Sequence, residues 1–157
     1  MPTRWERVYS GGMADFAREE IEETIAEAVD AVERNPLNAS YHSYLARAYI
    51  ASGEYQGALK ALKQVLALDP SDTNAWHTLG RLYIYKLQDL KLGTQALERA
   101  VKVDPNIAAV WQDLVESYLD LDRPQEAIRA GQKAVEVEPG EAEAWSALGV
   151  AYSLSSD

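Results

Sequence analysis

The chain has 157 residues, of which 47% are hydrophobic and 25% charged, and it contains no cysteine. These values are ordinary for a folded globular chain, and they exclude disulfide bonds and thiol chemistry within it. The formal net charge is −10, distributed as −5 over residues 1–36, +2 over 37–105 and −7 over 106–157. Such an acidic surface disfavours nucleic acid and anionic membranes. We therefore expect a protein or peptide partner of basic or mixed charge.

The N-terminal segment shows no targeting or membrane-spanning signal. No apolar run approaches the roughly 18 residues that a membrane-spanning helix needs. Residues 1–7 also lack the apolar core of a signal peptide. We expect a cytoplasmic protein without membrane insertion.

The first 36 residues are expected to form an arm followed by one helix. Ser10-Gly11-Gly12 predicts a flexible break, so residues 1–13 form an N-terminal arm that carries Trp5, Val8 and Tyr9 and is either docked or mobile. Good helix formers and apolar residues at helical spacing predict a helix from Ala14 to Arg34. This helix belongs to a segment of residues 14–36 that packs on the first repeat.

Prolines divide the rest of the chain into units of nearly constant length. Pro36, Pro70, Pro105 and Pro139 follow one another at intervals of 34, 35 and 34 residues. Leucine stands nine residues after each of them and tyrosine thirteen residues after. The residues six positions after the four prolines are His42, Trp76, Trp111 and Trp145. One supersecondary unit has therefore been copied along the chain.

Each copied unit is expected to hold two helices. The predicted repeats cover residues 37–70, 71–105 and 106–139, and a half repeat with one helix covers residues 140–157 and ends at Tyr152 or Ser153. We expect seven helices and no strand. The expected boundary signals are Asn38, Gly53, Asp72, Asp122 and Pro124.

The first repeat is expected to contain helices from about Ala39 to Ser52 and from about Tyr55 to Leu68. The second repeat is one residue longer than the others, which predicts a lengthened turn within residues 86–93.

Small residues recur where the paired helices must approach closely. Gly80, Ala46 and Gly149 occupy the same position of their units, but the third unit has Val115 there. A branched side chain at this position is expected to separate or rotate the third helix pair, unless a smaller residue lies opposite.

The period, the Trp-Leu-Gly-Tyr pattern from Trp76 to Tyr83 and the closing proline resemble the tetratricopeptide repeat family over residues 37–157. The resemblance implies an all-α solenoid that winds as a right-handed superhelix. It also implies a concave groove, lined by the exposed face of each first helix, that binds a peptide or helix of a partner.

The groove positions can be assigned by their offset from the repeated leucine. Arg47 and Arg81 are expected to form a cationic end, and Asp113 an anionic end together with other carboxylates. A merely solvated face is the alternative. Capture of an acidic chaperone tail, known in the family, is disfavoured because Asp113 would repel a carboxylate. The groove residues are Ser43, Tyr44, Arg47, Asn74, His77, Thr78, Arg81, Tyr85, Gln112, Asp113, Glu116 and Asp120.

The sequence carries no pattern typical of catalysis or of a metal or cofactor site. His42 and His77 are the only histidines, without an HExxH motif or Cys/His cluster. No Gly-x-Ser-x-Gly motif or glycine-rich phosphate loop occurs. We expect His42 to be a partly buried core residue bonded to a backbone group.

These observations favour a non-enzymatic interaction adaptor or scaffold. The alternatives are a scaffold that assembles through the solenoid ends, and a regulatory or chaperone-like subunit or fragment of a larger complex. An uncovered stripe of Trp145, Leu148 and Tyr152 in the last helix predicts self-association, with a homodimer as one form. Insertion of another chain's Trp5 arm or Phe16 helix, or a longer natural protein, remain alternatives.

Overall fold

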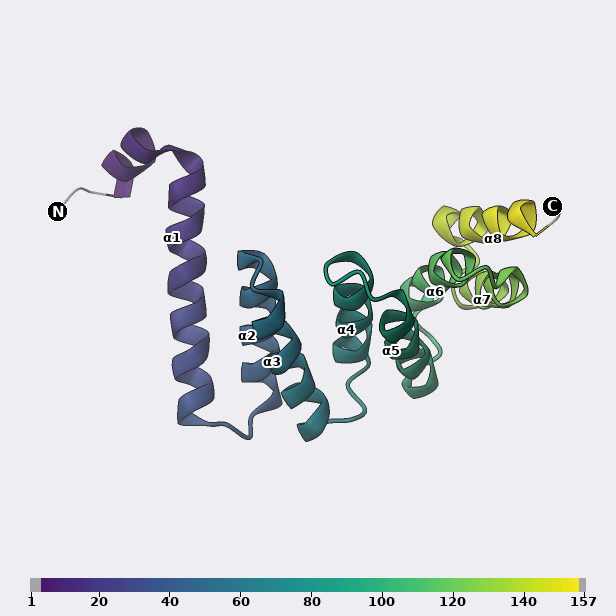
Figure 1. Ribbon diagram of the computed structural model, residues 1–157, viewed down its shortest axis with the longest axis horizontal. Helices are drawn as coiled ribbons and strands as arrows, with labels where there is room; N and C mark the ends of the chain where they lie inside the picture. The colour runs from purple at the N-terminus through teal and green to yellow at the C-terminus, as the bar shows by residue number, and fades with distance from the viewer. Residues whose placement is uncertain (1–3, 156–157) are drawn as a thin grey trace. The chain divides into compact units, whose positions relative to one another are not determined.

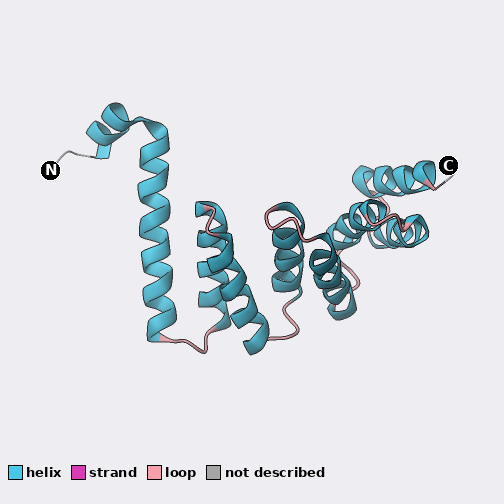
Figure 2. Ribbon diagram, viewed as in Figure 1, coloured by secondary structure: helices cyan, strands magenta, loops and turns pink. Residues whose placement is uncertain are grey.

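The computed structural model describes the backbone of residues 4–155 and the side chains of residues 17–155. Within that range it contains eight helices and no strand (Figure 2). The all-helical prediction is confirmed. The number seven was one too few, because the helix before the first repeat adds to those of the repeats. The chain divides into two compact units, Met1–Pro70 and Ser71–Asp157, and the division falls between the first and second predicted repeats.

The first unit consists of α1 (Arg4–Arg34), α2 (Ala39–Ser52) and α3 (Tyr55–Leu68) (Figure 1). Helix α2 contacts both α1 and α3. Helix α1 begins well before the predicted start at Ala14, because Ser10-Gly11-Gly12 does not interrupt it. A glycine costs a helix only about 1 kcal/mol relative to alanine, which neighbouring turns can offset.

The side chains of the predicted arm and of Phe16 lie outside the described residues. The division of the chain at residue 13 therefore stays a prediction.

Local capping residues fix both ends of α2, as the sequence predicts. The Asn38 side chain accepts a hydrogen bond from the Ser40 N–H over 3.0 Å. Gly53, with φ +83°, lies in the left-handed region and donates its N–H to the Ile50 carbonyl over 3.2 Å. The predicted bounds of α2 and α3 are both confirmed.

The second unit consists of α4 (Thr73–Tyr85), α5 (Leu90–Val103), α6 (Ala108–Asp120), α7 (Pro124–Val137) and α8 (Ala142–Leu154). Helix α4 packs on α5, and α7 packs on both α6 and α8. The first helices of successive repeats are also neighbours, since α4 contacts α6 and α6 contacts α8. These three helices therefore form one layer within the second unit.

Turns inside the repeats differ in length but share one backbone feature. The turn between α4 and α5 covers residues 86–89, whereas residues 53–54 and 121–123 form the corresponding turns of the other repeats. This confirms the predicted lengthening. A left-handed residue occurs in each turn: Gly53 at φ +83°, Gln88 at φ +55° and Asp122 at φ +56°.

Two predicted helix starts behave differently. The Asp72 carboxylate accepts the Ala75 N–H over 2.8 Å and caps α4 as predicted. Pro124 is the first residue of α7, also as predicted. The capping role of Asp122 was wrong, because Arg123 is the N-cap and no side chain bonds there. Asp122 instead supplies the left-handed residue of the turn.

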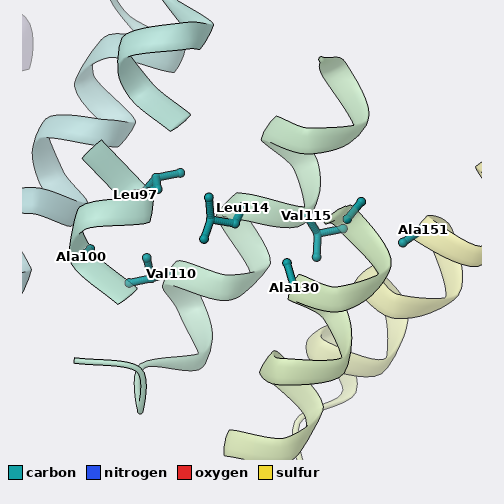
Figure 3. Packing of buried hydrophobic residues seen from close by; sticks show 8 residues of the cluster. Leu97, Ala100, Val110, Leu114, Val115, Ala130 and Ala151 are labelled. Atoms are coloured by element: carbon teal, nitrogen blue, oxygen red, sulfur yellow. The ribbon is translucent and has the colours of Figure 1, made fainter. Parts of the chain in front are cut away.

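The core of the second unit runs continuously through α5, α6, α7 and α8 (Figure 3). Leu97, Leu114 and Val110 are fully buried. Each large side chain buried in this way contributes about 1.5–3 kcal/mol to folding. Alanines between the large residues let the helices approach, as Ala100 and Ala130 show in Figure 3.

Large and small residues stand at exchanged positions in the third helix pair, compared with the second pair. Val115 replaces the glycine found at position 80, and it is 1% exposed. Gly131 of α7 in turn holds the position equivalent to Leu97 of α5, the side chain that lies against Gly80. A small residue therefore stands on α7 where α5 has a large one, and its nearest neighbour is Leu148. A β-carbon on Gly131 would come within 2.9 Å of Leu148 Cα, so α8 uses the same opening.

Candidate functional site

The residues six positions after Pro36, Pro105 and Pro139 bond to the backbone carbonyls of those prolines. The indole N–H groups of Trp111 and Trp145 donate to the carbonyls of Pro105 and Pro139, each over 2.8 Å. His42 Nε2 makes the same contact with the Pro36 carbonyl at 2.8 Å, and the residue is 7% exposed. The prediction for His42 is therefore confirmed, and the ring replaces tryptophan as the donor of this bond.

His77 lies one position later in its repeat and takes part in a charged contact between α4 and α6. Its Nε2 lies 2.7 Å from Asp113 Oδ2, and Arg81 Nη1 lies 3.4 Å from the same oxygen. The Asp113 side chain is only 12% exposed, whereas that of Arg81 is 55% exposed. A carboxylate withdrawn from water to this extent is stabilised by such partners.

A second contact joins the same helices farther along α4. The Tyr85 hydroxyl donates to Glu116 Oε2 over 2.8 Å, and the Arg81 guanidinium lies 5.5 Å from the centre of the Tyr85 ring. Burial and the hydrogen bond to Glu116 raise the pKa of Tyr85 above its ordinary value. Tyr85 therefore stays a neutral donor that holds the Glu116 carboxylate in place.

We call these five residues the α4–α6 cluster: His77, Arg81, Tyr85, Asp113 and Glu116. The sequence predicted separate cationic and anionic ends for the groove. Within the second unit, however, Arg81 and Asp113 lie together in one ion pair. The charges here partly neutralise each other, because α4 and α6 are neighbours.

A cavity of about 380 Å³ opens between α6 and α8 beside this cluster. Its floor and walls are apolar, and its rim is polar with two carboxylates. We call it the α6–α8 cavity. It is lined by Gln112, Val115, Glu116, Leu119, Glu143, Ser146, Ala147 and Val150.

A smaller cavity, of about 280 Å³, lies in the first unit between α1 and α2. We call it the α1–α2 cavity. It differs in charge, since Arg47 is its one charged lining residue and Tyr44 beside it is 41% exposed. The lining residues are Ile21, Thr24, Tyr44, Arg47, Ala48 and Ala51.

Helix α8 exposes a further apolar face. Trp145 is 54% exposed and Tyr152 47%, and a β-carbon on Gly149 would meet nothing within 4 Å. Leu148, which the sequence assigned to the same face, instead packs toward Gly131 of α7. The predicted stripe thus contains Trp145 and Tyr152 but not Leu148.

The remaining predicted groove residues are not all brought together. Asn74, Thr78 and Asp120 lie on α4 and α6 but do not enter the α4–α6 cluster. Ser43 lies on α2 without lining the α1–α2 cavity. Sequence reasoning missed the cavity walls, including Leu119 and Val150 of the second unit. The one feature of the sequence that could have indicated these wall residues is their helical spacing.

The described part of the chain offers neither a metal site nor a membrane span. It contains no group of three or more His, Cys, Asp or Glu residues arranged to hold a metal ion. None of the helices in this part combines the length and apolar character needed to cross a membrane.

The fold and these surfaces define a helical repeat protein. Family profiles match the chain over residues 46–87 (TPR repeat), 73–107 and 108–151 (tetratricopeptide repeat for both). The chain belongs to the tetratricopeptide repeat family.

Individual relatives agree with this assignment. The heat-shock protein cognate (HSC) co-chaperone sgt12 of Aspergillus fumigatus is 31% identical over 101 residues, which are 64% of this chain and 29% of the relative. The chain thus matches less than a third of that protein's length.

Solved structures are similar in fold. The crystal structure of MamA protein has a TM-score of 0.79 at 22% identity and covers 88% of this chain and 75% of that one. The first TPR of Spaghetti (RPAP3), bound to the HSP90 peptide SRMEEVD, has a TM-score of 0.69 at 17% identity and covers 76% and 94%.

Proposed function

We propose that the chain is a non-enzymatic adaptor that holds a peptide segment or helix of a partner protein on the first helices of its repeats. Membership of a family of interaction modules supports this proposal, as does the similarity to the first TPR of Spaghetti (RPAP3), which is bound to an HSP90 peptide. A cytoplasmic location is part of the proposal.

The observation that carries the proposal is the layer formed by α4, α6 and α8. It combines the α4–α6 cluster, which offers charged hydrogen-bonding groups, with the adjoining α6–α8 cavity, which offers apolar surface. A concave, mostly apolar site with a few placed polar groups is typical of ligand binding. The cavity volume of about 380 Å³ lies at the small end of the usual range of about 300–1,000 Å³.

An acidic tail fits this layer poorly. The peptide in the Spaghetti structure, SRMEEVD, carries two glutamates and an aspartate. Here Arg81 already contacts Asp113, and the neighbouring rim carries Glu116 and Glu143. An incoming carboxylate would therefore meet like charges, which disfavours it. We propose a basic or mixed-charge partner instead.

Arg81→Glu tests the proposal. The substitution breaks the ion pair with Asp113 and removes the cation that would hold the acidic or aromatic part of a mixed-charge partner. It should therefore weaken capture of a partner from the source cell by at least about tenfold, the effect of about 1.4 kcal/mol. Arg99→Glu, at an exposed position of α5, makes the same charge change elsewhere and serves as the control. If a captured partner retains its affinity in both Arg81→Glu and Arg81→Glu/Glu116→Lys, it binds on another surface and the proposal is wrong.

Self-assembly through α8 is a second candidate function. The exposed Trp145 and Tyr152 side chains and the open Gly149 position favour it, because an exposed apolar face of this kind is typical of a contact surface. Multi-angle light scattering at high protein concentration should then give a mass above 17.4 kDa. The mass should rise with salt, since the segment of residues 106–157 carries a net charge of −7 that salt screens.

The variant Trp145→Gln/Tyr152→Gln should return the mass toward that of the monomer. A strict monomer at both low and high salt would contradict self-assembly while leaving the adaptor proposal intact.

A further inference from the structure

The α6–α8 cavity has the chemistry of a site for one particular kind of peptide segment. Its floor includes Val115, which is 1% exposed, and its wall includes Val150, which is 46% exposed. Because one apolar residue is buried at the floor and another is partly exposed at the wall, the site can accommodate an aliphatic side chain that enters from solvent. The cavity lies at the small end of the usual range for ligand sites, a size that suits side chains of a peptide.

The charge at the rim selects what can flank that side chain. Glu116 and Glu143 both line the cavity, and none of the lining residues is a lysine, arginine or histidine. Within the described part of the chain, neither glutamate forms an ion pair with a lysine or arginine. Their charges are therefore available to a ligand rather than satisfied internally.

Glu116 is also held in position before any ligand arrives. Its Oε2 accepts the Tyr85 hydroxyl over 2.8 Å, which restricts the side chain while Oε1 remains for another donor. A carboxylate fixed by a neighbouring residue loses less conformational freedom on binding. Arg81, the nearest cation in the α4–α6 cluster, is engaged by Asp113 and the Tyr85 ring.

We infer that the α6–α8 cavity binds a segment of a partner protein in which aliphatic residues are flanked by lysine or arginine. The aliphatic side chain contacts Val115 and Val150, and the flanking cations lie against Glu116 and Glu143. This inference rests on the proposed adaptor function and names the chemistry of the partner. Neither an acidic segment nor a purely apolar one matches both the floor and the rim.

Matched peptides test the inference with the full chain. The probes are fluorescein-labelled Gly-Lys-Leu-Leu-Lys-Gly, the same peptide with glutamate in place of lysine, and the same peptide with serine in place of leucine. Fluorescence anisotropy should show the tightest binding for the lysine–leucine peptide. Both other peptides should bind at least about tenfold more weakly, since each lacks one half of the match.

Variants then locate the binding. Glu116→Gln/Glu143→Gln keeps the shape of the rim and should raise the Kd of the lysine–leucine peptide at least about tenfold. Glu138→Gln/Glu141→Gln, before α8 and outside the cavity lining, changes the net charge equally and should change the Kd less than about twofold. Val150→Ser should weaken the lysine–leucine peptide without affecting the serine peptide.

Several results would overturn the inference. These are equal binding of the glutamate peptide, equal weakening by both glutamine pairs, and absence of binding at millimolar peptide. If partner capture depends on Arg81 while the lysine–leucine peptide does not bind, only this inference is wrong. If the peptide binds through Glu116 and Glu143 while partner capture ignores Arg81, the proposed function is wrong as stated and the cavity assignment stands.

Discussion

Helices α4 and α8 carry the same repeat pattern in opposite environments. A β-carbon on Gly80 of α4 would come within 2.7 Å of Leu97 of α5, whereas on Gly149 of α8 it would meet nothing within 4 Å. Trp76 is half-buried, whereas Trp145 is 54% exposed. The repeat pattern therefore predicts a helix whose apolar face can pack against a neighbouring helix. It does not predict whether such a neighbour covers that face.

The uncovered helix is also the one that contributes to the α6–α8 cavity. Ala151 of α8 is fully buried against the core, yet Val150 beside it remains half-exposed at the cavity wall. The same helix thus anchors the repeat through one face and offers apolar surface on others. The absence of a neighbouring helix over this face thus makes α8 a candidate binding element, whereas α4 is a packing element.

The largest effect should come from removing the side chain that covers α4. Leu97→Ala deletes a fully buried side chain and should lower the free energy of unfolding by about 2–5 kcal/mol. Leu154→Ala on α8, where the leucine is 58% exposed, should change it by less than about 0.5 kcal/mol. Urea denaturation followed by circular dichroism measures both. Similar losses for the two variants would mean that α8 is covered in solution.

Glycine substitutions should give opposite signs in the two helices. Gly80→Ala forces the new methyl against Leu97 and the Gly93 carbonyl, so it should destabilise by about 1–3 kcal/mol. Gly149→Ala should stabilise by about 0.5–1 kcal/mol, because alanine is the better helix former and has space there. The urea midpoints of the two variants should therefore move apart. A loss of stability in Gly149→Ala would contradict the presence of free space beside Gly149.

The hydrogen bond from the Trp or His ring to the proline carbonyl should contribute similarly whether or not another helix packs over the apolar face of the helix. Trp111→Phe and Trp145→Phe each remove an N–H donor to a proline carbonyl, at a cost of about 0.5–1.5 kcal/mol. His42→Phe should cost a similar amount, while His42→Trp should be tolerated better. Thermal unfolding of the four variants measures this. A cost confined to Trp111 would show that the exposed bond of α8 contributes nothing.

The smallest expected effect is a loss of stability at alkaline pH that arises from two tyrosines of the second unit. Burial first, then hydrogen bonds to Glu116 and Glu98, raise the pKa values of Tyr85 and Tyr118 above their ordinary value. The folded state therefore binds more protons than the unfolded state once the pH exceeds the unfolded pKa of about 10. Stability should fall as pH rises from there.

The variant Tyr85→Phe/Tyr118→Phe should show a flatter dependence between about pH 9 and pH 11. An unchanged slope in this variant would show that other groups cause the alkaline loss.

Local chemistry explains why many helix ends were predictable. Asn38 and Asp72 each bond an N–H within three residues, so the signal and its effect share one short segment. Gly11-Gly12 misled the prediction because a glycine pair weakens a helix without forbidding it. The left-handed role of Asp122 depends on the geometry of the whole turn, which a capping pattern does not describe.

The candidate site was harder to predict because its contacts join residues that lie far apart in the sequence, in successive repeats. His77 and Asp113 are 36 residues apart, and their pairing depends on how α4 sits on α6. The family pattern placed both on exposed faces but not within contact. The α6–α8 cavity depends further on side-chain size, since Val115 forms its floor where a glycine stands in the second repeat.

Methyl NMR during titration with the Gly-Lys-Leu-Leu-Lys-Gly peptide tests the central claim most directly. The account predicts shifts in the methyl signals of Val115, Leu119 and Val150 around the α6–α8 cavity. The methyl group of Ile21 in the α1–α2 cavity, whose one charged lining residue is Arg47, should stay unchanged. Shifts at Ile21 without shifts at Val115 and Val150, or no shifts at saturating peptide, would contradict the account.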